Sequence, residues 1–369
     1  LSFPWIESWW RHFGSRLQPR LLGIWEDSGR LSGLAPFYVR RLGIRGTGGP
    51  GVLSVMGDVG VGSEYLGVLA RREEVEAVVS ALSSHLRGSW SLADLRGLRE
   101  DSFSARLLAK ALSGPAPDRL HRERHPCSCA PLPGDYEAYL ASLPQKFRST
   151  LRYRTNKLVK NFQVRLLRTR NEHEIEPHLA RFFDMHQGRW IAEGHTGSFY
   201  TQSKRAFYDE ISREFLRREW LRFYHLEVDG VLRASQFGFA FNGVLHSLQE
   251  AFDRDFHPPG VGGVGVVLRG LALKQSISEG IHAYDFLGGV ADYKSRWGTQ
   301  THFIDRVRIG APGPAGALAF AATAGVRRLK DWGRERSPAW LHRSRERLRS
   351  WRRIRHARQI AARLGGGEG

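Results

Sequence analysis

The stretch from His246 to Gly298 constrains the fold of this chain more than any other. A strand-like run with polar residues ends in acidic side chains, and a turn rich in proline and glycine follows it. A helix-like run comes next, and a second strand-like run ends at Asp285 before another glycine turn. Four apolar residues of the helix-like run have the spacing i, i+3, i+4, i+7 of a helix that lies on a sheet: Val264, Val267, Leu268 and Leu271. The order of these segments predicts an α/β fold.

The glycine turn before this helix is a candidate site for an anion. Gly260, Gly262 and Gly263 carry no side chains, so a ligand can approach the unpaired amides and the positive end of the helix dipole. We predict that this turn holds the pyrophosphate of a ligand that reacts beside it. The alternative is a tight strand-to-helix connection without a ligand, and the turn alone does not decide between the two.

The length of 369 residues exceeds what one hydrophobic core usually organises, so two domains are expected. Hydrophobic residues make up 41% of the chain and include 20 Phe and 11 Trp, which is ample for globular cores. We expect α/β domains over residues 1–125 and 126–310, followed by a basic helical tail over residues 311–369.

Local patterns predict several elements inside these domains. Asp27-Ser28-Gly29 is typical of a hairpin turn. Residues 63–70 have the composition of a buried strand, and residues 71–86 the periodicity of a helix. A helical pattern over residues 135–160 must break or bend before Pro144.

The charge of the chain is placed unevenly. Of the net charge of +19, residues 312–369 contribute a surplus of 10, from 14 Lys or Arg against 4 Asp or Glu. A basic tail of this kind favours an anionic partner. We expect residues 337–364 to form an amphipathic helix on an anionic membrane surface; a helix packed on the body and a disordered tail are the alternatives. No specific nucleic-acid partner is expected.

Sequence also bears on the compartment. The best apolar run, residues 315–326, has about half the length needed to cross a bilayer, so no transmembrane segment is expected. The chain has two cysteines, Cys127 and Cys129, which are too few and too close for a disulfide framework. We therefore expect a reducing, cytoplasmic location, with peripheral attachment at the inner membrane face through the tail.

The same two cysteines raise the question of a metal. With His121 and His125 they could form a cluster, but all four lie on one short stretch, without the separated ligand pairs of most structural zinc sites. Packed thiols on a short strand are the better interpretation. We expect no metal.

Several motifs resemble those of a known family. The run His257-Pro258-Pro259-Gly260-Val261-Gly262 resembles the acyl-CoA pyrophosphate loop of GNAT acyltransferases, Gln/Arg-x-x-Gly-x-Gly/Ala, with His257 where that loop carries Gln or Arg. Residues 284–289 and 292–298 resemble the closing motif of the BioF2-like, or CelD-like, acetyltransferases, which are relatives of the FemABX peptidyltransferases. Residues 143–158 and 229–243 resemble that family's Arg-rich helix and central hairpin.

This resemblance implies a fold and an activity. The fold would be two GNAT-like mixed-sheet domains in tandem, followed by the basic tail. The activity would be acyl-CoA-dependent N-acyl transfer, with acetyl-CoA as donor and an amino sugar or related envelope or exopolysaccharide precursor as acceptor. A FemABX-like enzyme with an aminoacyl-tRNA donor is one alternative, although the chain lacks the long helical insertion of many such proteins. A non-catalytic GNAT-like binding module is another.

Acyl transfer from a thioester to an amine requires removal of a proton from the amine and stabilisation of the leaving thiolate. Strand alternation places His246 and Glu250 on one face. Glu250 lies near the strand end, where GNAT-like enzymes place their base; the alternative is a carboxylate paired with an arginine such as Arg254. The resemblance makes Tyr293 the candidate acid for the thiolate. Asp285 is a further catalytic candidate.

Other residues are candidates for binding. His257, Gly260, Val261, Gly262, Gly263 and Lys294 are assigned to the donor, and Arg148, Arg152, Trp190 and His246 to the acceptor. The two arginines belong to a run of six cations on one predicted helix, which contains no acidic residue and would suit an anionic glycan group. A solvated face is the alternative for the cations, and core packing is the alternative for Trp190.

Overall fold

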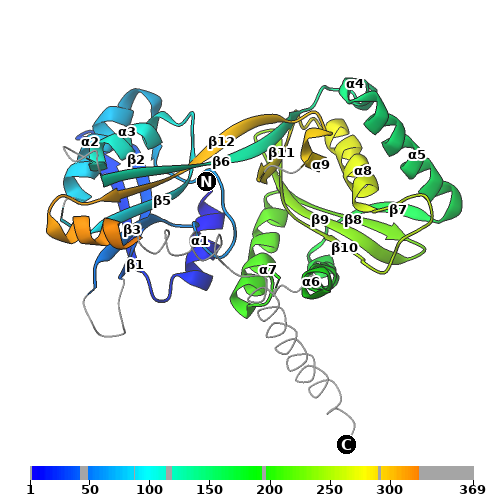
Figure 1. Cartoon of the computed structure of the whole chain (residues 1–369), viewed down its shortest axis with the longest axis horizontal. Coiled ribbons are helices and arrows are strands. Elements are labelled where there is room, and N and C mark those ends of the chain that lie inside the picture. The colour runs from blue at the N-terminus through cyan, green and yellow to red at the C-terminus, as the bar shows by residue number, and fades with distance from the viewer. Residues whose placement is uncertain are drawn as a thin grey trace, which may run out of the picture.

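The computed structural model describes residues 2–41, 49–86, 88–113, 119–192, 197–289 and 292–323. The strands of this described part form one 12-stranded mixed sheet, which continues through both halves of the molecule (Figure 1). The predicted membrane-binding helix at 337–364 lies outside the described residues. Among the helices described, none is long and apolar enough to cross a membrane.

The N-terminal half begins with a helix that is followed by a hairpin. Its elements are α1 (Phe3–Phe13), β1 (Gln18–Trp25), β2 (Leu31–Arg41), β3 (Gly51–Val55), β4 (Leu69–Ala70), η1 (Arg72–Glu74), α2 (Val75–Leu86), β5 (Leu92–Arg99), α3 (Phe103–Ser113) and β6 (Leu120–Pro131).

The C-terminal half contains longer helices and ends in a long strand. Its elements are α4 (Tyr136–Ser142), α5 (Gln145–Asn161), β7 (Val164–Arg168), η3 (Glu172–Glu174), α6 (Ile175–Ala192), α7 (Gln202–Arg217), β8 (Leu221–Val228), β9 (Val231–Phe241), β10 (Val244–Phe252), α8 (Gly265–Ser278), β11 (Ala283–Gly288), α9 (Asp292–Ser295) and β12 (Gln300–Gly310).

The two halves share one topology and exchange a strand. In each half an antiparallel group leads into a parallel pair joined by a helix, β3-α2-β5 in the first and β10-α8-β11 in the second. Strand β12 lies between β5 and β6, and β6 lies between β12 and β11, so each half completes the sheet of the other (Figure 1). The predicted arrangement of two mixed-sheet halves in tandem is confirmed. Residue 125 falls inside β6, and the proposed domain limits stay a prediction.

Three large hydrophobic cores, besides a small one at Val52, Leu92 and Ala319, cover the faces of the sheet in the part of the chain that the structure describes. Helices α2 and α3 pack on the N-terminal half, and α4, α5 and α8 pack on one face of the C-terminal half. The opposite face of that half is covered by α6, α7 and also α1, whose Trp5 and Trp9 join a core with Phe182 and Phe207. Because α1 comes from the start of the chain, this third core fastens the two halves together.

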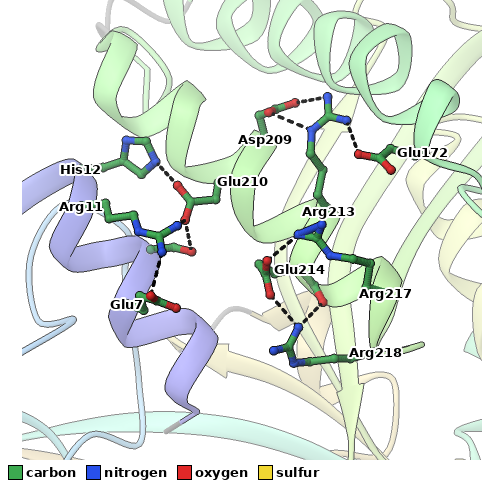
Figure 2. Close-up of polar contacts among 11 residues, drawn as sticks. Glu7, Arg11, His12, Glu172, Asp209, Glu210, Arg213, Glu214, Arg217 and Arg218 are labelled. Carbon is green, nitrogen blue, oxygen red and sulfur yellow. Dashed lines mark hydrogen bonds and ion pairs between the residues drawn. The ribbon is translucent and has the colours of Figure 1, made fainter.

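Polar contacts reinforce the packing of α1 on α7. Glu210 accepts hydrogen bonds from Ser8 (2.9 Å) and Arg11 (2.8 Å), and its other oxygen lies 2.8 Å from Nε2 of His12 (Figure 2). Burial raises the pKa of Glu210, but these three partners reverse the effect and hold it below its usual value.

The local predictions have mixed outcomes. The hairpin at Asp27–Gly29 and the break at Pro144, which separates α4 from α5, are confirmed. The strand expected at residues 63–70 is wrong, because only Leu69 and Ala70 pair as a strand. Tyr65 has a φ of 61°, which interrupts an extended conformation, while Leu66 and Val68 are buried. Leu66 and Val68 therefore pack into the core outside any strand, and Leu66 forms only an isolated bridge, to Leu98.

Candidate active site

A cavity of about 860 Å³ opens where β10 and β11 separate. The two strands are paired in parallel as far as His246 and Asp285, and beyond this point they diverge. The register of β10 against β9 shifts between Ser247 and Gln249. The cavity is therefore lined by the part of β10 that extends beyond its pairing with β11, by the end of β11 and by the N-terminus of α8.

The glycine turn reaches this cavity at Gly263, while Gly260, Val261 and Gly262 are not among its lining residues. Gly260 and Gly262 have φ values of 73° and 67°, which favour glycine, and buried Val261 anchors the turn between them. The first backbone bond of the helix is from Leu268 to the carbonyl of Val264 (2.9 Å). The amides that precede Leu268 are thus the initial donors of the helix, and residues 263–266 line the cavity.

Two cations of α5 lie against the turn. A Cβ atom at Gly262 would be 3.3 Å from the guanidinium of Arg154, and one at Gly260 would clash with Nζ of Lys157. Lys157 also donates to the hydroxyl of Tyr153 (3.1 Å). Positive charge is therefore supplied where the helix dipole already favours an anion.

Arg148 and Arg152, the predicted acceptor residues of the same helix, are placed elsewhere. Arg148 donates to the carbonyl of Ala141 (2.9 Å), and Arg152 pairs with Glu137 (2.5 Å), both toward α4. Neither lines the cavity. Helical spacing puts positions 154 and 157 on a different face of the helix from 148 and 152. The run of cations predicted that this helix is basic, but it did not predict which of its cations lie against the glycine turn.

Glu250 lines the cavity and is paired with an arginine. Nε of Arg269 donates to Oε1 (3.0 Å), and a second bond from Arg269 reaches Oε2. The partner is thus Arg269 of α8, while Arg254 lies beside Asp255 (3.5 Å). Burial lowers the pKa of Arg269, but the adjacent Glu250 carboxylate outweighs it and the pKa is raised. The guanidinium stays charged, and the role of Glu250 as a base stays a prediction.

Tyr293 and Lys294 also line the cavity, with different surroundings. Burial, aided by the charge of Glu250, raises the pKa of Tyr293, so its phenol holds a proton that could be donated. Lys294 is buried and donates to the carbonyls of Phe286 (3.0 Å), Leu287 (3.3 Å) and Gly288 (2.8 Å). Three acceptors use the three donors of an ammonium. Lys294 therefore holds the end of β11, and this arrangement does not fit the phosphate contact expected of it.

Two other predicted binding residues, His257 and Trp190, line the same cavity. The indole of Trp190 donates to Nε2 of His186 (3.2 Å), so its ring is held by α6 at the cavity wall. Their contacts with a ligand stay predictions.

His246 and Asp285 lie in a different group of side chains. Asp285 accepts a hydrogen bond from the hydroxyl of Tyr65 (2.6 Å), and Nδ1 of His246 is 3.5 Å from the same oxygen. The hydroxyl of Tyr65 is also 2.7 Å from Nε2 of His302. Burial raises the pKa of Asp285, but His246 and Tyr65 outweigh it and the pKa is lowered. Sequence reasoning missed Tyr65, because its segment had the composition of a strand.

Within the described residues, no group of three His, Cys, Asp or Glu side chains is placed to hold a metal ion. Cys127 is buried, and burial raises the pKa of its thiol to about 12. Cys129 lies in the same strand, between β11 and β12. Both thiols are protonated packing groups at neutral pH.

Residues 145–295 match the family described as "Acetyltransferase (GNAT) domain". This part of the chain is a GNAT acetyltransferase domain. The matched region contains the glycine turn, the separated ends of β10 and β11, and the candidate residues Glu250 and Tyr293. It runs from the start of α5 to the end of α9.

Solved structures extend the similarity to both halves. FemX is 11% identical, with 82% of this chain and 90% of FemX covered and a TM-score of 0.57. A conserved protein of unknown function from Bacteroides thetaiotaomicron is 13% identical (84% and 90% covered, TM-score 0.53). The DUF2156 C-terminal domain of a protein from Agrobacterium fabrum is 11% identical (86% and 91% covered, TM-score 0.51). No curated protein matches the sequence. The chain thus contains a GNAT acetyltransferase domain, and its fold is shared with FemX, so the predicted GNAT-like fold is confirmed.

Proposed function

We propose that this protein transfers an acetyl group from acetyl-CoA to the amine of an amino sugar or a related envelope or exopolysaccharide precursor. The observation that carries the proposal is the glycine turn at the N-terminus of α8, which borders the large cavity and is flanked by Arg154 and Lys157. Backbone amides, a helix dipole and two cations together suit a pyrophosphate. The nature of the acceptor rests on the family resemblance.

The cavity offers the remaining parts of this reaction. A pantetheine arm would lie between the separated ends of β10 and β11, where its amide groups can pair with the two strand edges that face this gap. Tyr293 stands at the cavity wall with a protonated phenol, as departure of a thiolate requires. Arg269 keeps a fixed positive charge nearby, because Glu250 compensates it.

An aminoacyl-tRNA donor is the second candidate. It is favoured by the fold shared with FemX and by a net charge of +19, which suits a polyanion. The two donors differ in size and in their contacts. A tRNA would engage far more basic surface, so its binding would fall more steeply with salt than the binding of CoA.

The test uses Gly262→Asp. The new side chain would project toward Arg154, place a carboxylate where the pyrophosphate should sit and occupy a cation that should bind it. We expect the affinity for acetyl-CoA, measured by calorimetry, to fall by a hundredfold or more, roughly 3 kcal/mol of binding free energy. The melting temperature should change little, because Asp tolerates positive φ better than most residues.

Gly280→Asp is the matched control. Gly280 has a φ of 80°, lies just beyond the other end of α8 and has no neighbour within 4 Å of an added Cβ. The control should bind acetyl-CoA like the wild type. Equal affinity of the Gly262 variant and the wild type would remove the phosphate role of the turn. Binding of aminoacyl-tRNA with no binding of acetyl-CoA would favour the second candidate.

A further inference from the structure

A smaller cavity of about 90 Å³ adjoins the large one. Leu248 of β10 lines both. Glu64 lines the small cavity, and its carboxylate lies 3.4 Å from the amide of Gly288, a residue of the large cavity. Glu64 therefore stands at the boundary between the two spaces, where β10 and β11 diverge, although it belongs to the N-terminal half of the chain.

The segment that carries Glu64 is held in place by both halves. Ser63 accepts a hydrogen bond from the indole of Trp5 (2.8 Å), and the amide of Leu66 donates to the carbonyl of Gly97 (2.8 Å). Tyr65, with its positive φ, donates to Asp285 of β11. A non-glycine residue stays in this conformation only where its surroundings enforce it, and such residues gather at functional sites.

The surroundings of Glu64 suit a group that takes up a proton. Burial raises the pKa of Glu64 to about 7; Asp285 adds to this effect, and Lys294 and the amide of Gly288 oppose it. His246 of β10 lines the same cavity, and Cys127 of β6 and Tyr208 of α7 lie within electrostatic range. A carboxylate with a pKa near neutrality is matched to general-base work.

Much of the wall of the small cavity is aromatic, beside Leu66, Leu248 and Leu287. Its rings come from α1, α7 and the strand region of the C-terminal half: Trp5, Phe215, Trp220, Phe239 and Phe241. Aromatic faces attract ammonium groups. The cavity thus offers a protonated amine both aromatic side chains and a carboxylate in its wall.

We infer that the small cavity admits the primary ammonium group of the acceptor and that Glu64, rather than Glu250, removes its proton. This inference rests on the proposed function. Glu64 takes the first proton and passes it to solvent, and the amine nitrogen then bonds to the thioester carbonyl carbon. As the C–S bond breaks, the sulfur receives a proton from Tyr293, which regains one from the nitrogen. The products are the amide and CoA thiol.

The test measures CoA release by the full-length protein, with acetyl-CoA as donor and glucosamine and hexylamine as acceptor probes. We expect kcat/KM of the wild type to rise with pH through about 7, because Glu64 must be deprotonated. Glu64→Gln should lower the rate on the order of a hundredfold and remove this pH dependence. Its affinity for acetyl-CoA should stay unchanged.

Two variants serve as comparisons. Glu73→Gln changes an exposed carboxylate of the same half and should leave rate and pH profile unaltered. Glu250→Gln should keep the pH dependence, whatever its rate. The inference is overturned if Glu64→Gln retains the rate of the wild type, if the pH dependence disappears with Glu250 instead, or if acetyl-CoA binds and neither amine is acylated.

A second measurement does not need turnover. Slightly below neutral pH, carbodiimide and methylamine should amidate Glu64, as detected by mass spectrometry, and hexylammonium should protect it. Absence of this modification or of the protection overturns the inference even where acetyl-CoA binds. Failure of acetyl-CoA to bind, with Glu64 modified and protected, instead removes the proposed donor and leaves the ammonium site standing.

Discussion

Each half of the molecule contains a parallel strand pair of the same topology, and the space beyond the pair differs between the halves. In the N-terminal half, β3 and β5 pair at Val52–Leu92 and Leu53–Ala93, and the space beyond is filled by Leu66, which forms a bridge to Leu98. In the C-terminal half, the space beyond His246 and Asp285 is the large cavity. One topology therefore yields a packed core in one half and a candidate active site in the other.

The segment that fills the first space also serves the second. Leu66 packs into the N-terminal half, while Glu64 and Tyr65, immediately before it, reach the C-terminal half. The N-terminal half therefore contributes to the candidate active site. The segment that fills the space beyond β3 and β5 also places two polar side chains at the site of the C-terminal half.

The largest effect should come from the buried ion pair of the C-terminal half, here called the open half because the space beyond its parallel strands is a cavity; the N-terminal half is the filled half. Glu250→Gln leaves Arg269 buried without an opposite charge, and we expect a loss of about 3 kcal/mol in the free energy of unfolding, measured with urea. Asp94→Asn is the comparison in the filled half. Its partners Arg96 and Arg306 are partly exposed, so they can be hydrated and the loss should be about 1 kcal/mol. Equal losses of unfolding free energy in the two variants would contradict the expected dependence on burial of the arginine partners.

A smaller difference should follow from the same truncation in each strand gap. Leu66→Ala empties a filled space, and such changes cost about 2–5 kcal/mol, with the lower part expected here because the surrounding loop can relax. Leu248→Ala only enlarges cavities that already exist, so we expect about 1 kcal/mol. Urea unfolding of both variants measures the contrast, and a reversed order would contradict the assignment of filled and open halves.

The sequence predicted those parts of the site that depend on residues close together along the chain. The glycine turn and the buried side chains Val264, Val267 and Leu268 follow from local spacing, and the GNAT domain follows from its motifs. Distant partners were not predictable. The exchange of β6 and β12 joins segments far apart in the chain, and the pairing of Glu250 with Arg269 depends on how α8 packs against β10. Glu64 was missed because its segment has the composition of a strand, although it pairs only through a bridge at Leu66 and the two residues Leu69 and Ala70.

The smallest effect concerns the link between the halves through α1. Glu210→Gln weakens the bonds from Arg11 and His12, and we expect a loss of about 1 kcal/mol or less at neutral pH, since these groups are partly exposed (Figure 2). Because the pKa of Glu210 is lowered in the folded protein, its contribution is present at neutral pH and declines as pH falls through that lowered value, which urea titrations at several pH values would detect. Glu214→Gln, on the same helix, affects only the local pairs with Arg217 and Arg218 and is the control. If the Glu210 variant unfolds in two steps and the control in one, the contacts of α1 make the two halves unfold together. If both variants unfold in identical single transitions with an unchanged midpoint, the exchanged strands β6 and β12 hold the two halves together instead.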